Sequence, residues 1–404
     1  MQLLSGGASV LSAKLQSVRG GIFPWVHGCA ILALFLGEGP ATKANASPLQ
    51  PDRFVGAAGC KSSSCHGGAG EKRSQYLTWV RQDFHSRAYA VLVTARSARM
   101  AEALALPAAQ SSVRCTVCHS PFQSVPSVRL TKTAQLDEGV SCEDCHGAAG
   151  SWLRGHTRRD WTYATRVGAG MHDLRNLYVR ANTCVACHQN LETDLLQAGH
   201  PALTFELDGQ SVAEPKHWLE EEKWSGPRAW LVGQAVALRE MSWALANDRP
   251  VGTEATTRWD ALAWLLAKTT ANQPSLRSID PLGGAADRAK FAVTQEQADW
   301  LARQAAAIPW DERRTRSILQ AALAAEPDFR QSVEASPELL FWRAVRLVLA
   351  LDRLARALDQ PVAGSTTPAA LRTLYDDIGA RPDFQPAKFA TDLATFRTTM
   401  DRTP

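Results

Sequence analysis

Four short runs between residues 60 and 188 place a pair of cysteines directly before a histidine. The runs, numbered here as motifs 1 to 4, are Cys60–His66, Cys115–His119, Cys142–His146 and Cys184–His188. Motifs 2 to 4 read C-x-x-C-H, whereas motif 1 has four residues between its cysteines. Together they use all but one of the nine cysteines, so no other feature constrains the fold of this chain as strongly.

The spacing C-x-x-C-H predicts covalent attachment of a c-type haem, because the two sulfurs add to the porphyrin and the adjacent imidazole binds the iron. We therefore predict four covalently bound haems. The attachment residues are Cys60, Cys65, Cys115, Cys118, Cys142, Cys145, Cys184 and Cys187, and the proximal iron ligands are His66, His119, His146 and His188.

Two other uses of paired cysteines explain the pattern less well. A zinc site needs two further ligands at ribbon or finger spacing, and here each pair has its own adjacent histidine instead. Four disulfides would leave those four histidines without a role. The longer loop of motif 1 can still place both sulfurs near the ring edge, and we expect attachment through both cysteines because Cys60 has no other partner once the N-terminal segment is removed. The alternative is a single thioether through Cys65.

Histidines outside the motifs supply candidates for the second axial position of each iron. Four bis-histidine haems need four more imidazoles, and five lie between the N-terminal segment and residue 224. We predict His85, His156 and His200 as distal ligands, with His172 as the fourth candidate. His217, at a domain junction, ranks behind them. The sequence does not pair these histidines with particular irons.

The N-terminal segment predicts export. An apolar stretch at 21–37 is followed by Ala44-Asn45-Ala46, a cleavage pattern typical of signal peptides. We expect residues 1–46 to be a cleaved signal peptide and the mature chain to be periplasmic, where covalent haem attachment takes place. The longest uninterrupted apolar run, residues 30–36, is far shorter than the roughly 20 residues of a membrane-spanning helix, so no transmembrane helix is expected.

The net charge of +4 does not indicate a nucleic-acid partner. Haem propionates would add negative charge, and no basic run with interleaved aromatic residues is present. The expected partners are redox proteins.

Composition changes near residue 224 and predicts two domains in a mainly α chain. Residues 47–223 contain every motif and little helical periodicity, which favours a haem-packed cytochrome domain in which short helices begin or end at the motifs. One longer helix is expected over 75–92. Residues 224–404 are rich in Ala, Leu and Arg and predict a bundle of five or six helices that buries its own core. We expect this domain to serve docking or oligomerisation.

Local signals predict individual helices in the second domain. Apolar residues recur at helical spacing after Ser336-Pro337 and across 230–245. A capping-box pattern at Thr294–Gln297 predicts a helix that runs to Ile308, and Thr367-Pro368 predicts another helix start.

Three segments resemble the tetrahaem cytochrome c-554 family and its multihaem relatives. They are Trp79 to Ala88, which includes His85; Gly139 to Gly147, followed by His156; and Ala198 to Pro201, followed by Phe205-Glu206. The resemblance covers about residues 55–206 and implies that His85 and His156 are distal ligands. The four-residue spacer of motif 1 and the C-terminal helical half have no counterpart in the small tetrahaem protein.

The resemblance implies an electron carrier rather than an enzyme; the best-known member takes electrons from hydroxylamine oxidoreductase. The alternative is a multihaem oxidoreductase that acts on a small nitrogen or sulfur species at one five-coordinate haem, with an arginine such as Arg114 assisting. In the family the second haem can lack a distal ligand, which points to motif 2 as the open site.

Overall fold

A computed structural model describes residues 53–218, 220, 225–252, 254–280, 286–330, 335–358, 369–379 and 381–401. These residues belong to one compact unit, which spans Gln50–Pro404. The predicted signal peptide at 1–46 lies outside the described residues. No helix within the described ranges is long and apolar enough to cross a membrane.

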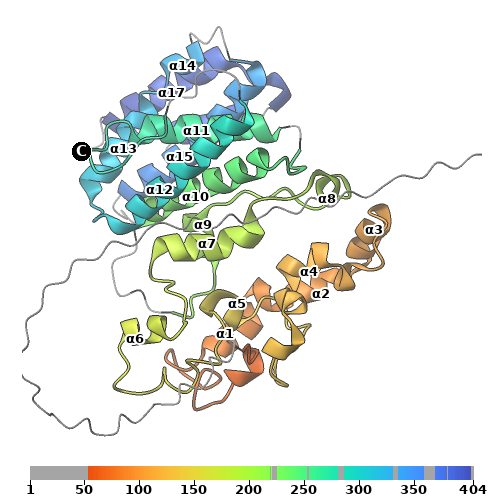
Figure 1. The fold of residues 1–404 in the computed structure, drawn as a ribbon. Coiled ribbons are helices and arrows are strands. Elements are labelled where there is room, and N and C mark those ends of the chain that lie inside the picture. Colours follow the sequence, from red (N-terminus) through yellow and green to blue (C-terminus); the bar gives the residue numbers. More distant parts are fainter. Residues whose placement is uncertain are drawn as a thin grey trace, which may run out of the picture. The chain divides into compact units, whose positions relative to one another are not determined.

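The regular elements among the described residues are helices, and the single β-type contact among them is an isolated parallel bridge between Phe54 and Leu130 (Figure 1). The prediction of a mainly α fold is therefore confirmed.

The region that contains the motifs consists of short helices separated by turns and loops. Its α-helices are α1 (Gln75–Gln82), α2 (Ala88–Leu92), α3 (Ala95–Ala103), α4 (Val113–His119), α5 (Cys142–His146), α6 (Tyr163–Gly168), α7 (Leu177–His188), α8 (Thr193–Gln197) and α9 (Leu207–Ala213). Its 3₁₀ turns are η1 (Ala57–Gly59), η2 (Phe84–Arg87), η3 (Ala109–Ser111), η4 (Pro121–Ser124) and η5 (Ser127–Arg129).

The helix predicted over 75–92 is interrupted at Asp83, so this prediction was wrong in detail. Asp83 has an extended backbone, and its side chain accepts a hydrogen bond from the backbone N–H of His85, which caps η2. Because an aspartate favours a cap over a helix interior, α1 ends at Gln82 and the chain changes direction before His85.

The C-terminal region contains longer helices that pack on one another. They are α10 (Gly226–Ala246), α11 (Ala255–Thr270), α12 (Arg288–Ala307), α13 (Glu312–Leu323), α14 (Pro327–Arg330), α15 (Pro337–Leu358), α16 (Ala369–Gly379) and α17 (Pro386–Asp401), with a 3₁₀ turn η6 (Arg381–Asp383). The helices after Ser336 and across 230–245 agree with the predictions, whereas the predicted start at Thr367-Pro368 lies outside the described residues. The described part of this region has more helices than the five or six expected.

The capping-box prediction at Thr294 was also wrong in detail. Helix α12 begins earlier, at Arg288, where the Asp287 carboxylate accepts a hydrogen bond from the backbone N–H of Lys290. Thr294 is buried inside the helix, and the predicted end at Ile308 agrees with the observed C-cap.

The main hydrophobic core lies among the C-terminal helices and includes part of the motif region. Helix α10 packs on α12, α7 and α9, and α15 packs on α11 and α13. Leu177, Ala181 and Val185 of α7, the helix that ends in motif 4, belong to this core. The domain boundary at residue 224 stays a prediction, since the core extends across it.

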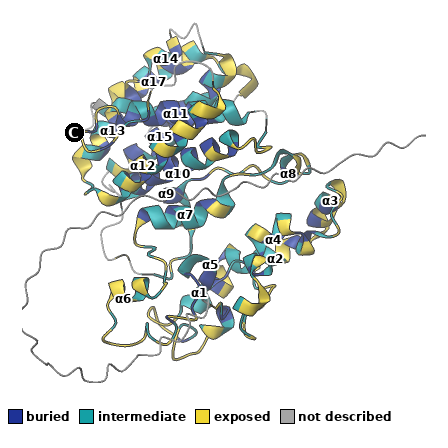
Figure 2. Ribbon diagram, in the orientation of Figure 1, coloured by how far each residue is buried: buried dark blue, intermediate teal, exposed yellow. Residues whose placement is uncertain are grey.

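The motif region buries few side chains by comparison. Figure 2 shows α1–α6 mostly intermediate or exposed, whereas buried segments dominate α10, α11 and α15. Outside the main core, the described residues form two small hydrophobic clusters, around Trp152 and around Leu92. This burial pattern fits a region in which bound cofactors contribute the missing apolar surface.

Candidate haem-binding sites

Motifs 2, 3 and 4 each form the last turn of a helix, α4, α5 and α7, which ends at the motif histidine. In a helix, residues three and four apart lie on one face, so the two sulfurs and the imidazole of each motif are directed to the same side. At motif 3 the Asp144 carboxylate accepts a hydrogen bond from the backbone N–H of Ser141 at 2.6 Å as part of a capping box, which fixes where α5 begins.

Motif 1 forms a series of turns instead of a helix, because four residues separate its cysteines. The backbone N–H of His66 donates to the carbonyl of Cys60 at 3.2 Å, so the loop closes on itself. Gly67 lies against the carbonyl of Lys61 so closely that a Cβ atom would not fit. The loop therefore brings Cys60 and His66 together despite the longer spacing.

Each motif histidine faces one histidine from elsewhere in the chain. The ring centroids are 6.1 Å apart for His66 and His156, 6.3 Å for His119 and His200, 6.5 Å for His146 and His217, and 6.0 Å for His188 and His85. We call these pairs sites 1, 2, 3 and 4, after their motifs. The rings are nearly parallel at site 1, with an interplanar angle of 18°, and steeply inclined at the others.

The separation of these rings fits an iron between them. A metal–imidazole bond of about 2 Å, with the ring centre about 1 Å beyond the nitrogen, places two axial imidazole centres about 6 Å apart. Rings in direct contact can also lie about 4.5–7 Å apart, so it is the recurrence of the same pairing at all four motifs that indicates haem. The four pairs, each beside two cysteines of its motif, therefore fit covalently bound haem with two axial histidines.

Hydrogen bonds orient six of these eight imidazoles through Nδ1. The acceptors are carbonyl or carboxylate oxygens, so Nδ1 carries the proton and Nε2 keeps its lone pair for a metal. The pairs are His66 with Gln75 Oε1, His119 with the carbonyl of Ala88, His156 with that of Leu153, His200 with that of Pro201, His217 with that of Pro215, and His85 with Asp83 and Glu214.

Burial keeps several of the ligand candidates neutral. It lowers the pKa of His146 to about 4, and it also lowers the pKa of His119, His156 and His188. A neutral imidazole is the form that binds a metal, so these side chains are in the required state near neutral pH.

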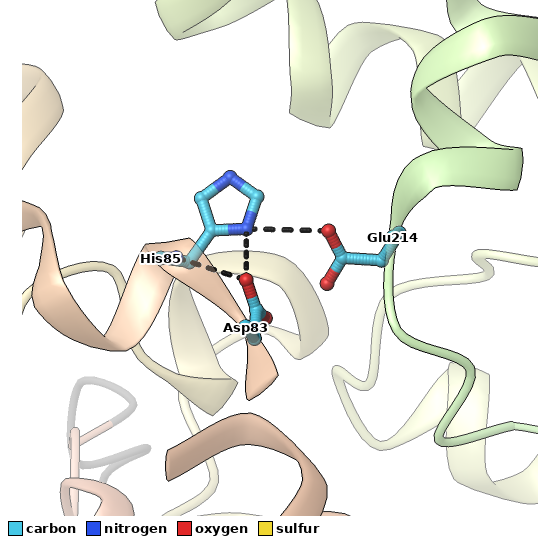
Figure 3. Close-up of side chains that lie close together, drawn as sticks. All are labelled: Asp83, His85 and Glu214. Atoms are coloured by element: carbon cyan, nitrogen blue, oxygen red, sulfur yellow. Dashed lines mark hydrogen bonds and ion pairs between the residues drawn. The ribbon is translucent and has the colours of Figure 1, made fainter. Parts of the chain in front are cut away.

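His85 has a different environment, shown in Figure 3. Its Nδ1 lies 3.0 Å from Asp83 Oδ1 and 3.4 Å from Glu214 Oε2, while its other ring nitrogen points away from both carboxylates. Together with Asp83, Glu214 raises the pKa of the free imidazole to about 10. Burial opposes ionisation of Asp83, but its hydrogen bonds lower the pKa of that carboxyl to about 2. Nothing in the local sequence around Asp83 or Glu214 predicts their contact with His85.

Contacts between cysteines of different motifs show which sites are neighbours. The thiol of Cys60 interacts with that of Cys142, which joins sites 1 and 3. The thiols of Cys118 and Cys187 interact in the same way and join sites 2 and 4. Cys145 and Cys184 are also electrostatic neighbours, which connects sites 3 and 4. The order in space is therefore 1–3–4–2.

Among the predicted distal candidates, His85, His156 and His200 lie opposite motif histidines, and the fourth histidine in such a position is His217. His172 lies behind the end of α5, where its Nδ1 bonds to the carbonyl of Cys145 and its backbone N–H donates to the carbonyl of His146. Its ring thereby lies against the backbone of motif 3, beside Gly147.

Two other expectations about site 2 also change. His200 faces His119, so the motif that the resemblance marks as open has a second imidazole. Arg114, considered as an aid to anion binding, instead forms ion pairs with Glu192 and Asp194. These pairs connect α4 to the segment that follows motif 4.

A buried carboxylate and a glycine hold motif 3 in place. Glu143 accepts hydrogen bonds from the backbone N–H groups of Val55, Gly56 and Ala149, and thereby ties the start of the described chain to α5. Gly139 has a φ of +77° and lies against the carbonyl of His85, which accepts a hydrogen bond from the N–H of Val140 at 3.0 Å. The approach to motif 3 thus supports the distal ligand of site 4.

Comparison with known sequences agrees with this geometry over part of the chain. Residues 59–147, which contain motifs 1, 2 and 3, match the family described as cytochrome c554 and c-prime. This region is therefore similar to c-type cytochromes, proteins that bind haem covalently and transfer electrons. No curated protein and no solved structure matches the chain.

Proposed function

We propose that this chain is an exported tetrahaem c-type cytochrome that transfers electrons between redox partner proteins in the periplasm. The observation that carries the proposal is the set of four imidazole pairs at 6.0–6.5 Å, one at each motif. When bound, each haem supplies an iron that gains and loses one electron. Two fixed imidazoles suit this role, because they hold the iron in both oxidation states with little rearrangement.

The arrangement of the motifs supports transfer along the molecule. Cysteine contacts place the sites in the order 1–3–4–2, so each attachment site is adjacent to the next. The distal ligands come from segments remote from the motifs they face, which ties the sites into one rigid framework. Export is supported by the apolar stretch and the Ala44-Asn45-Ala46 pattern.

The C-terminal helices are proposed to dock this framework onto a partner or a second copy. Their buried side chains form a hydrophobic core, to which residues of α7 also belong. Sedimentation of the holoprotein, alone and with a redox partner, tests this role.

Haem content and electron exchange test the main proposal. The intact mass should exceed that of the chain cleaved after Ala46 by four haems. In stopped-flow experiments, the reduced protein should deliver four electrons to an oxidised soluble c-type cytochrome of higher potential. Fewer than four covalent haems would contradict the tetrahaem proposal, and failure to reduce the acceptor would contradict the role as a carrier.

A further inference from the structure

The axial histidines differ in what their Nδ1 atoms contact. Among the six with a hydrogen bond at this atom, five contact neutral oxygens: one side-chain amide and four backbone carbonyls. Only His85, at site 4, contacts carboxylates, and it contacts two. Because all the sites belong to one molecule, the sites whose histidines contact neutral oxygens serve as internal references for site 4.

The two carboxylates come from separate parts of the chain and are fixed in place. Asp83 is 3% exposed, and its Oδ1 also accepts the backbone N–H of His85 at 2.9 Å. Glu214 follows α9, and its side chain is 24% exposed. Figure 3 shows both carboxylates at the same edge of the ring.

A carboxylate at Nδ1 changes the electronic character of a ligand. It draws the Nδ1 proton toward itself, so Nε2 becomes a more basic donor to the metal. Greater electron donation and nearby negative charge both stabilise the ferric state more than the ferrous state, and burial of Asp83 strengthens the effect because little water screens it.

We propose that Asp83 and Glu214 give the haem at site 4 the lowest reduction potential of the four. This inference rests on the proposed function, since it requires a haem between His85 and His188. Asp83 and Glu214 act through His85 and are therefore residues that tune the ligand and do not bind the iron.

Two further charged side chains interact with groups of site 4. Arg180 interacts electrostatically with Cys184, and it is itself paired with Glu220 at 3.3 Å and donates to the carbonyl of Leu174. Asp144, in motif 3, also interacts electrostatically with His85, although burial raises the pKa of its carboxyl to about 7.

The position of site 4 determines how a low reduction potential there distributes electrons among the four sites. Site 4 lies between sites 3 and 2 in the spatial order, so it is an interior site. A low potential there keeps electrons of the partly reduced protein on the other sites, and site 4 is the last to be reduced.

A redox titration of the holoprotein, followed by electron paramagnetic resonance (EPR), tests the proposal. His85→Ala first identifies the EPR signal of site 4, because the iron of that site becomes high-spin and its low-spin signal is lost. In the unsubstituted protein, the low-spin signal identified in this way should have the lowest reduction potential of the four. Asp83→Asn, Glu214→Gln and the double variant should raise its potential, the double variant most, while the other three signals keep theirs. Glu312→Gln, a carboxylate paired with Arg316 on α13 of the C-terminal region, is the matched control.

Different outcomes test the reduction potential of site 4 and the ligation of its iron. An unchanged site 4 potential in low-spin Glu214→Gln and double variants, or a lower potential at another site, would overturn the inference. If Asp83→Asn does not fold, Glu214→Gln alone must still shift the potential upward. Absence of a high-spin signal in His85→Ala would instead contradict the proposed ligation, and with it the proposed function.

Discussion

The imidazole of His217 lies opposite that of His146, with 6.5 Å between the ring centroids. The residue that the sequence favoured for this role, His172, is hydrogen-bonded to the backbone at the end of α5. His217 Nδ1 is held by the carbonyl of Pro215 at 3.1 Å, and its ring packs edge-on against Trp218. A short segment after α9 therefore completes site 3.

Alanine substitutions distinguish these two histidines. His217→Ala should leave the iron at site 3 with one axial imidazole, so one haem of four becomes high-spin. His172→Ala should leave all four low-spin, because it removes only the hydrogen bond from Nδ1 to the carbonyl of Cys145. The absorption and EPR spectra of the oxidised proteins measure both results. A high-spin signal in the His172 variant alone would reverse the assignment.

Site 2 should open when its distal ligand is removed. His200 follows a turn in which Arg96 donates a hydrogen bond to the carbonyl of Gly199 at 2.6 Å, so the position of its ring is fixed. His200→Gly should produce one haem that binds carbon monoxide when reduced, and added imidazole should restore the low-spin spectrum by filling the vacated space. If the variant does not bind carbon monoxide, His200 is not the ligand.

Gly139 should be needed for site 4 although it belongs to the approach to motif 3. A Cβ atom at this position would lie 2.5 Å from the carbonyl oxygen of His85, and its φ of +77° disfavours other residues. Gly139→Ala should therefore displace His85 and weaken the low-spin signal of site 4. Gly168→Ala is the matched control, since no atom lies within 4 Å of its added Cβ. Equal spectra for the two variants would contradict this coupling.

The sequence predicts the haem attachment residues because their signal is local. A cysteine pair and its histidine lie within one helical turn, so spacing alone identifies them. The distal pairing is not local: His85 follows motif 1 but faces motif 4, and His156 follows motif 3 but faces motif 1. Such pairings depend on how the turns between short helices fold, which no periodicity records.

Helix positions show the same division between local and tertiary signals. The long apolar pattern after Ser336 predicts α15 correctly, because its burial follows from helical spacing. The capping pattern at Thr294 fails, since Asp287 caps the helix two turns earlier and Thr294 is buried. The carboxylates Asp83 and Glu214 meet only in the folded chain, so their role at His85 requires the structure.

The core of the C-terminal helices should depend on Trp259. This side chain is fully buried on α11, packs edge-on against Phe291, and donates a hydrogen bond from Nε1 to Ser242 Oγ at 2.8 Å. Trp259→Ala should lower the free energy of unfolding by about 3–5 kcal/mol through loss of packing. Trp259→Phe keeps most of the volume and should cost less. Urea unfolding followed by circular dichroism measures both, and equal values would show that packing at this site is not decisive.

The central claim is that all four irons have two axial histidines. Carbon monoxide titration of the fully reduced protein, together with the EPR spectrum of the oxidised protein, tests it most directly. We predict four low-spin irons per chain and no spectral change with carbon monoxide. A high-spin signal equal to one or more irons, with matching carbon monoxide binding, would contradict the claim.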